Sequence, residues 1–180
     1  GATFRHEQFD GYKAHRRPMP DELRPQIERM RQVLNALNIP IYEADGYEAD
    51  DVIGTLSKQA AEKGIEAIII TGDSDMLQLV DEHVHIVLPG GQRFGEYRYF
   101  DRDAVIARYG FGPERVIDYK ALVGDKSDNI PGVPGIGDKT AKQLIQQFET
   151  FDEIFERADE IAQARARNAI IANRDLAYQS

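Results

Sequence analysis

The sequence predicts an α/β fold in which a mainly parallel sheet is flanked by helices and followed by a helical C-terminal region. Two observations lead to this prediction. Strand-like and helix-like segments alternate up to about residue 112. From residue 124 the texture changes to a loop rich in glycine and proline, followed by helical segments. With 42% hydrophobic residues, the 180-residue chain can bury a core of its own.

The first predicted elements are a helix and a strand. Apolar residues recur at three- and four-residue steps over 21–37, which predicts an amphipathic helix with Pro25 in its first turn. The short apolar run 39–42 is expected to form a strand. A second helix is predicted over 48–63, with Gly64 as its C-terminal cap.

The apolar run 67–71 (AIIIT) shows no alternation, so we expect a strand buried on both faces. Together with 39–42 and the intervening helix it predicts a right-handed βαβ unit. Later elements are expected as a strand at 84–88, a turn at 89–91, a hairpin arm at 94–100, and helices at 101–109, 114–123, 138–148, 151–157 and 159–173. These predict an α/β core over 1–112 with a basic N-terminal segment, and a helical region over 113–180 with a helix-hairpin-helix at 130–147.

Composition excludes several classes of protein. The chain has no cysteine, which excludes a disulfide scaffold and a thiolate zinc site and suits a cytoplasmic location. No apolar run approaches the ~20 residues that span a bilayer, so no membrane partner is expected. The net charge of −9 argues against simple electrostatic binding of nucleic acid, although bases gather in residues 1–31. Because the chain begins with Gly1 rather than methionine, we expect a fragment or a processed product.

Acidic residues gather in two groups where predicted elements meet. Glu48, Asp50 and Asp51 open a helix; capping of the helix N-terminus is the alternative interpretation, although three acids exceed what a cap needs. Asp73 and Asp75 leave a predicted buried strand at its carboxyl end, where α/β sheets bind ligands. For that pair, a polar turn is the alternative.

A third group, Asp125 and Asp128, lies in the glycine-rich loop, where turn formation with Asn129 is the alternative. All three groups could converge on one edge of the sheet. Seven carboxylates without nitrogen or sulfur ligands suit Mg²⁺ or Mn²⁺. Two such ions could activate water and stabilise the leaving oxygen of a phosphodiester.

The loop at 132–140 (GVPGIGDKT) has the glycine spacing of a phosphate-binding P-loop, but Asp138 stands where the lysine should be and no strand precedes it. A hairpin between two helices fits better, because glycines let backbone amides approach a phosphate at the next helix N-terminus. A plain helical corner is the alternative. The candidate DNA-binding residues here are Gly132, Gly135, Gly137, Lys139, Thr140 and Lys142, with Lys126 nearby.

Four motifs, in order, carry a resemblance over nearly the whole chain: TFRHE with DGYKAHR, GYEADD, TGDSD, and GDKSDNIPGVPGIGDKTA. Together they resemble the 5′-nuclease domain of bacterial DNA polymerase I, in the flap endonuclease superfamily. The resemblance implies a PIN-like fold with a helix–three-turn–helix element. It also implies Mg²⁺-dependent cleavage, by two-metal-ion catalysis, of 5′ flaps and 5′ ends of DNA or of RNA–DNA.

The resemblance also implies roles for individual residues. The acids named above are expected to be ligands of two Mg²⁺ or Mn²⁺ ions: Glu48, Asp50, Asp51, Asp73, Asp75, Asp125 and Asp128. Arg5 and Lys13 match basic residues that face the scissile phosphate, and Arg16 is expected to bind DNA. Gly135 to Thr140 match a hairpin that grips the uncleaved duplex, often with a K⁺ ion. The implied setting is a monomer in the bacterial nucleoid, joined to the polymerase domain of the same parent chain.

The chain departs from the family pattern at its front, where a strand with a first aspartate, and a second aspartate just before Gly1, are expected in the family. Without these two ligands, the alternative function is a catalytically crippled module that only binds the DNA backbone. A Mg²⁺-dependent phosphatase acting on small molecules is a third possibility, but it explains neither the hairpin nor the basic opening segment.

Overall fold

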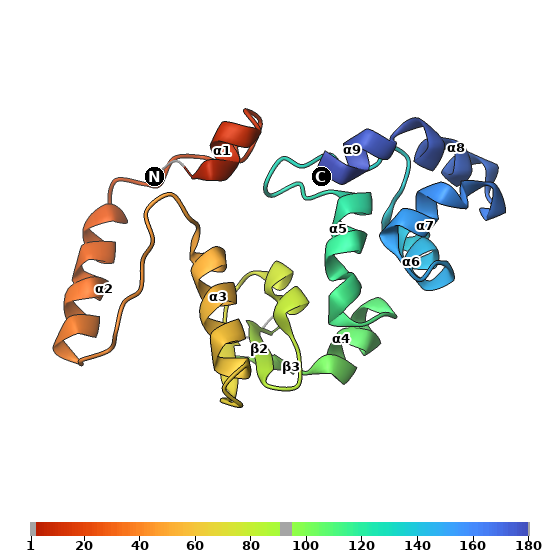
Figure 1. The fold of residues 1–180 in the computed structure, drawn as a ribbon. Coiled ribbons are helices and arrows are strands. Elements are labelled where there is room, and N and C mark those ends of the chain that lie inside the picture. Colours follow the sequence, from red (N-terminus) through yellow and green to blue (C-terminus); the bar gives the residue numbers. More distant parts are fainter. Residues whose placement is uncertain (1–2, 91–94, 180) are drawn as a thin grey trace.

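The structure is a computed structural model, and it describes residues 3–90 and 95–179 (Figure 1). A small sheet lies among helices, with α2 and α3 on one side of the molecule in Figure 1 and α5 to α9 on the other. The elements, with 3-10 helices labelled η, are α1 (Phe4–Gln8), α2 (Arg24–Ala36), α3 (Ala49–Ala61), β1 (Ala67–Ile70), η1 (Ser74–Leu79), β2 (Val84–Pro89), β3 (Tyr97–Phe100), α4 (Arg102–Tyr109), η2 (Pro113–Arg115), α5 (Val116–Val123), α6 (Asp138–Gln147), α7 (Phe151–Glu156), η3 (Ala158–Glu160), α8 (Ala164–Ala172) and α9 (Arg174–Gln179).

The sheet has the strand order β1-β2-β3 and is mixed. β1 pairs with β2 in parallel, with Ile69 opposite Ile86, and β2 pairs with β3 antiparallel, with Ile86 opposite Phe100. The predicted α/β fold class, with helices flanking the sheet and a helical C-terminal region, is therefore confirmed. The hairpin arm expected at 94–100 forms over Tyr97–Phe100. Residue 94 of that prediction, and residue 91 of the turn predicted at 89–91, lie outside the described residues.

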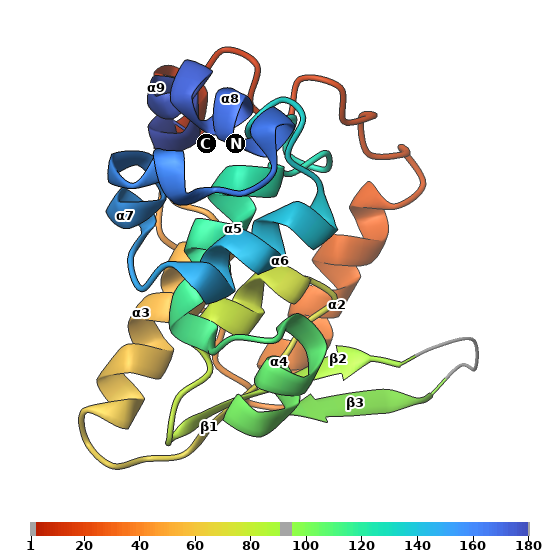
Figure 2. The same ribbon diagram turned by 90° about the vertical axis from the view of Figure 1, so that its right-hand side faces the viewer.

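One face of the sheet carries the core. Val84, Ile86 and Leu88 are buried on β2, and Phe100 on β3 is buried with them. The core continues without interruption into the C-terminal helices, where Leu122, Leu144, Ile154 and Ile170 are buried in the same cluster. In Figure 2 the helices α5 and α6 lie above the sheet, and α4 lies level with its strands. The α/β layer and the helical region therefore share one core.

The opposite face of the sheet corrects the prediction for residues 67–71. Ile68 and Ile70 are 59% and 73% exposed, so β1 packs on one face only, where Ile69 is partly buried against the core. A β-branched run indicates a strand, but burial on two faces needs a second covering layer. Within the described residues, no layer covers the side of β1 on which Ile68 and Ile70 lie.

The predicted strand at 39–42 does not form, and this segment is an irregular connection between α2 and α3. A strand needs a partner for its backbone groups, and Pro40 lacks the amide hydrogen that a ladder requires. The prediction of a βαβ unit that includes this strand is therefore wrong. The parallel partner of β1 is instead β2, which follows it through the short helix η1.

The helices agree better with the sequence, because their signals are local. α2 begins with Pro25 in its first turn, although all of its residues remain at least partly exposed. α3 ends shortly before Gly64, whose φ of +67° is favoured by glycine. The helices α4 to α8 lie within the predicted ranges, whereas α1 and α9 were not predicted. Among the described helices, none combines the length and apolar character that crossing a bilayer requires.

Candidate metal centre

The acidic residues that open α3 have different environments. Asp51 accepts a hydrogen bond of 2.9 Å from the backbone amide of Glu48, which caps the helix. Arg5 donates two hydrogen bonds of 2.7 Å to Asp51, which hold the pKa of that carboxyl below its ordinary value. Burial, and then the neighbouring charge of Asp73, raise the pKa of Asp50. Capping therefore accounts for Asp51, and Asp50 lies where a cation would relieve its charge.

Glu48 and Asp128 share cationic partners from the segment after α1. Lys13 Nζ lies 2.7 Å from Glu48 Oε2 and 3.6 Å from Asp128 Oδ2. The hydroxyl of Tyr12 lies 3.0 Å and 3.2 Å from the same two oxygens, and Arg16 donates to Asp128 at 2.6 Å. Burial alone would raise the pKa of Glu48, but hydrogen bonds from Lys13 and Tyr12 outweigh it and lower that pKa. The charges of Glu48 and Asp128 are thus already balanced by protein cations.

A second group of carboxylates lies at the carboxyl end of β1 and consists of Asp73, Asp75 and Asp125. They line a hollow of about 450 Å³ together with Lys120. Lys120 Nζ lies 2.6 Å from Asp75 Oδ1 and 2.8 Å from Asp125 Oδ2. Asp73 caps η1 by accepting a hydrogen bond of 2.8 Å from the backbone amide of Asp75. Two of the predicted ligands therefore share one ammonium group, and the third, Asp73, lines the same hollow.

The two carboxylates that share Lys120 differ in pKa. Burial raises the pKa of Asp75, and this effect together with the charges of Asp73 and Asp125 exceeds the opposing effect of Lys120. Asp125 is also buried, but hydrogen bonds from Lys120 and Ser127 hold its pKa well below the ordinary range. The charge of Asp75 is therefore incompletely balanced, a condition that an additional bound cation would relieve.

The glycine-rich loop connects the carboxylates at the end of β1 with those near the start of α3. Asp125 and Ile130 exchange two backbone hydrogen bonds of 2.8 and 2.7 Å, which close the loop. Ser127 Oγ lies 2.6 Å from Asp125 Oδ1 and 3.4 Å from Asp128 Oδ1. On the other side, Asn129 donates to the carbonyl of Gly11 at 2.7 Å. A continuous polar network therefore runs from the end of β1 to the segment after α1.

The glycines of the predicted hairpin differ in their exposure and in the space around them. Gly137 is exposed at the N-terminus of α6, and a Cβ built on it meets no atom within 4 Å. Gly135 has a φ of +90°, which favours glycine, and Lys139 is exposed beside it. Gly132, predicted to contact DNA, is instead buried against the backbone of Gly124. The exposed surface of the hairpin therefore begins after Gly132. In α6, Thr140 is half-buried and Lys142 pairs with Asp138 at 3.0 Å.

The structure brings in three residues that sequence reasoning missed: Tyr12, Lys120 and Ser127. Tyr12 and Ser127 lie beside predicted site residues, so their positions gave a weak signal. Lys120 gave none, because its partner Asp75 is 45 residues away along the chain and no spacing relates them.

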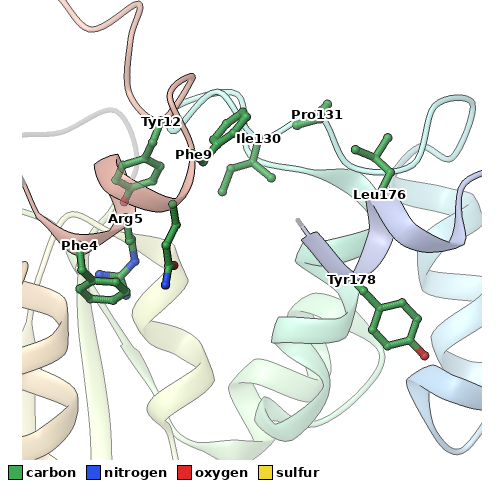
Figure 3. A pocket seen from close by; sticks show the side chains of 9 residues that line it. Phe4, Arg5, Phe9, Tyr12, Ile130, Pro131, Leu176 and Tyr178 are labelled. Atoms are coloured by element: carbon green, nitrogen blue, oxygen red, sulfur yellow. The ribbon is translucent and has the colours of Figure 1, made fainter.

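Beside Arg5 and Tyr12 lies a larger cavity of about 530 Å³, seen in Figure 3. Its walls come from α1, from the glycine-rich loop and from α9, and most of the labelled side chains are apolar or aromatic. This cavity contains none of the carboxylates predicted to bind metal. It is therefore a separate feature from the candidate metal centre.

The donor chemistry of the site fits a hard divalent cation, because every predicted ligand atom is a carboxylate oxygen. In residues 3–90 and 95–179, no three Asp, Glu or His side chains are already placed to hold one ion. Lys120 occupies the position between Asp75 and Asp125, so a bound ion would replace its contacts. Asp73, Asp75 and Asp125 line the hollow at the end of β1, and the pKa values of Asp50 and Asp75 are raised by burial and neighbouring carboxylates. By donor type and these features, the ligands that fit Mg²⁺ or Mn²⁺ best are Asp50, Asp73, Asp75 and Asp125.

Two family models match the chain. The 5′-3′ exonuclease N-terminal resolvase-like domain matches residues 1–110, and the 5′-3′ exonuclease C-terminal SAM fold matches residues 111–180. Among curated proteins, DNA polymerase I of Chloroflexus aurantiacus is 51% identical over 162 residues, covering 88% of this chain and 17% of that protein. DNA polymerase I of Bacillus caldotenax is 43% identical, covering 99% of this chain and 20% of that protein. The chain thus spans about a fifth of the length of these relatives.

Solved structures share the fold. The T5 D15 protein co-crystallised with metal ions superposes with a TM-score of 0.77 at 22% identity, covering 99% of this chain and 69% of that chain. The catalytic core of Rad2 in complex with DNA superposes with a TM-score of 0.56 at 17% identity, covering 83% of this chain and 49% of that chain. At these identities the likeness concerns the fold alone.

Proposed function

Because the chain belongs to the 5′-3′ exonuclease family, we propose that it supplies the carboxylate site and the duplex-binding hairpin of a structure-specific 5′ nuclease. The observation that carries this proposal is the gathering of Asp73, Asp75 and Asp125 at the carboxyl end of β1. These residues come from two loops 50 positions apart in the sequence, and burial leaves the charge of Asp75 incompletely balanced. Such a site suits a divalent cation better than a structural turn.

The chemistry of the proposed reaction is hydrolysis of a phosphodiester. Two Mg²⁺ or Mn²⁺ ions, when bound, supply an activated water and stabilise the charge on the leaving oxygen. Asp50, Asp73, Asp75 and Asp125 hold the cations in this proposal. Lys13 and Arg16 orient the phosphate, because both lie at the Asp128 end of the same polar network. Arg5 holds the start of α3 in place through Asp51.

The substrate follows from the exposed part of the hairpin. Gly135 and Gly137 let backbone amides approach a phosphate without reading base sequence, and Lys139 and Thr140 lie beside them, where a K⁺ ion would also bind. We propose that the DNA carries a 5′ flap or a free 5′ end, or is an RNA–DNA hybrid. T5 D15 flap endonuclease has been crystallised with DNA and metal ions, which supports this choice. The proposed setting is a monomer working with a polymerase domain in the bacterial nucleoid, with residues 1–112 as the nuclease core and 113–180 as the DNA-binding region.

The test is cleavage of a labelled 5′-flap duplex by the 180-residue chain in Mg²⁺, in Mn²⁺ and in EDTA. We expect a cut near the flap junction that requires the divalent ion. Binding of the same duplex without cleavage in either metal would support the alternative, a module that only binds the DNA backbone. The absence of both binding and cleavage would contradict the proposed function.

Binding through the hairpin gives a sharper prediction. In Gly137→Val the new side chain meets no protein atom, so the fold should persist while the approach of the backbone to a phosphate is blocked. We expect an affinity for duplex DNA at least about tenfold lower, equally for unrelated sequences. Lys139→Ala should reduce the salt slope by about 0.9, the value for one lost phosphate contact.

The measurement for both variants is fluorescence anisotropy in Ca²⁺, at several salt concentrations, on two duplexes of unrelated sequence. Ala36→Val adds similar bulk at an exposed position on α2 and serves as the control. If Gly137→Val binds as tightly as this control, the hairpin is a plain helical corner.

A further inference from the structure

A second polar cavity, of about 410 Å³, lies between α4, α5 and α6. Four cations line it: Arg108, Lys120, Lys126 and Lys142. Only one carboxylate, Asp138, is among its lining residues in the described part of the chain. We call this feature the basic cavity. Its excess of positive charge is notable in a protein whose net charge is −9.

Two of the four cations already have partners. Lys142 lies 3.0 Å from Asp138, which also accepts a hydrogen bond of 2.7 Å from the Tyr119 hydroxyl. Lys120 is held by the carboxylates at the end of β1. In contrast, no described carboxylate forms an ion pair with Arg108 or Lys126. These two cations are therefore available to pair with an anion that enters the basic cavity.

Aromatic rings hold two of the four cations, Arg108 and Lys142, in place. Lys142 Nζ lies 5.7 Å from the ring centre of Tyr109 and 5.9 Å from that of Tyr119. The guanidinium of Arg108 lies 5.5 Å from the ring centre of Tyr109 and 5.6 Å from that of Phe100. Both tyrosines are buried, so the rings form a fixed support. Fixed cations lose less side-chain entropy when they bind an anion.

The position of the basic cavity connects the two parts of the proposed site. It shares Ser74 and Lys120 with the hollow that contains Asp73, Asp75 and Asp125. Its other side is formed by Asp138 and Lys142 of α6, the helix that follows the hairpin, and Figure 2 shows α6 next to α5. A nucleic-acid strand held at the hairpin and cleaved at the carboxylates would pass this cavity.

We propose that the basic cavity binds a backbone phosphate of the nucleic acid between the hairpin and the cleavage site. The guanidinium of Arg108 and the ammonium of Lys126 are the groups that proteins use for phosphate oxygens. The contact is independent of base sequence, because it involves only the backbone. This inference rests on the proposed function and adds a specific subsite to it.

The test compares two double variants that remove the same charge. Arg108→Ala/Lys126→Ala removes the unpaired cations of the basic cavity. Lys58→Ala/Lys63→Ala is the matched control, since both lysines are exposed, one in the last turn of α3 and one just after it, at the end remote from its carboxylates. Anisotropy titrations of a flap duplex in Ca²⁺, at several salt concentrations, should show about tenfold weaker binding and a salt slope lower by about 0.9 for the cavity variant. The control should stay within about twofold of the unmodified protein.

Additional measurements separate the possible failures. Arg108→Ala also loses two ring contacts, so Lys126→Glu, which keeps them, should weaken binding as well, and melting temperatures should confirm that the variants are folded. If both cavity variants bind like the control while Lys139→Ala binds more weakly, the basic cavity is not a phosphate subsite and the proposed function stands. If the unmodified protein binds no DNA, the proposed function fails together with this inference.

Discussion

Replacing Gly132 with alanine is expected to lower the free energy of unfolding by about 2–5 kcal/mol. Gly132 has a φ of +62°, a conformation that costs about 1–2 kcal/mol for an L-residue with a side chain. The new Cβ would also meet the backbone of Val123 and Gly124, which cannot move aside as a flexible side chain could. Such overpacking costs about 1–3 kcal/mol more. Urea unfolding followed by circular dichroism would measure the sum.

Gly64→Ala is the matched control for this prediction. Gly64 has a similar φ of +67°, but a Cβ there meets nothing within 4 Å. Only the backbone cost of about 1–2 kcal/mol is expected at this position. Equal destabilisation by the two substitutions would show that the close packing of Gly132 on Gly124 does not hold the loop.

The same substitution should impair the candidate metal centre. Gly124 and Gly132 flank the loop that carries Asp125 and Asp128, and Val133 donates a backbone hydrogen bond of 2.9 Å to Leu122 just beyond it. A shift of this loop would separate Asp125 from Lys120. We therefore expect Gly132→Ala to reduce both stability and any Mg²⁺-dependent cleavage, whereas Gly64→Ala should leave cleavage unchanged.

Asp75→Asn is expected to reduce Mg²⁺-dependent cleavage by at least about 100-fold. Metal ligands contribute several kcal/mol of transition-state stabilisation, and each 1.36 kcal/mol corresponds to a factor of ten in rate. The amide keeps the shape of the side chain but removes a charged oxygen that a cation requires. Asp103→Asn, at an exposed position on α4, is the control and should cleave normally. Cleavage by Asp75→Asn at the rate of this control would exclude Asp75 as a ligand.

Stability measurements provide an independent readout of the same substitution. A carboxyl whose pKa is raised by folding makes the folded state less stable once pH exceeds its unfolded pKa, because its charged form is disfavoured. The pKa of Asp75 is raised, so Asp75→Asn in EDTA at neutral pH should leave the melting temperature unchanged or raise it. The pKa of Asp125 is lowered, so its charge stabilises the fold above the unfolded pKa, and Asp125→Asn should lower the melting temperature.

Adding Mg²⁺ completes this comparison. At a concentration ten times its dissociation constant, an ion bound only to the folded state adds about 1.4 kcal/mol, or roughly 3–6 °C in melting temperature for a chain of this size. We expect this rise in the unmodified protein and its loss in Asp75→Asn. A rise of equal size in both proteins would place the bound ion elsewhere.

The helices and the middle strand were determined locally. Capping acids, the apolar spacing and Gly64 defined α3, and Pro25 marked the start of α2, because a helix closes its hydrogen bonds within a few residues. The strand at 84–89 was likewise visible as a short apolar run. The interactions that define these segments come mainly from residues near them in the sequence, so the local sequence was enough to predict them.

Which apolar segments form strands of the sheet depends on the tertiary structure. The runs 39–42 and 67–70 look alike as short apolar segments, yet only the second pairs with a neighbour. A strand is stable only when another segment satisfies its backbone groups, and that partner is remote in sequence. For the same reason, the exposed face of Ile68 and Ile70 was not predictable from their side chains.

The sequence by itself located the acidic groups that define the candidate site, because acids at a helix start, at a strand end and in a glycine-rich loop are visible as local patterns. It did not show which cation balances which acid. Lys120 meets Asp75 across 45 residues, and Tyr12 meets Asp128 across 116. Electrostatic interactions depend on distance and burial in space. The tertiary structure alone therefore shows which charges are balanced. Protein cations balance the charges of Glu48, Asp51 and Asp128, whereas the charges of Asp50 and Asp75 remain incompletely balanced and favour an additional cation.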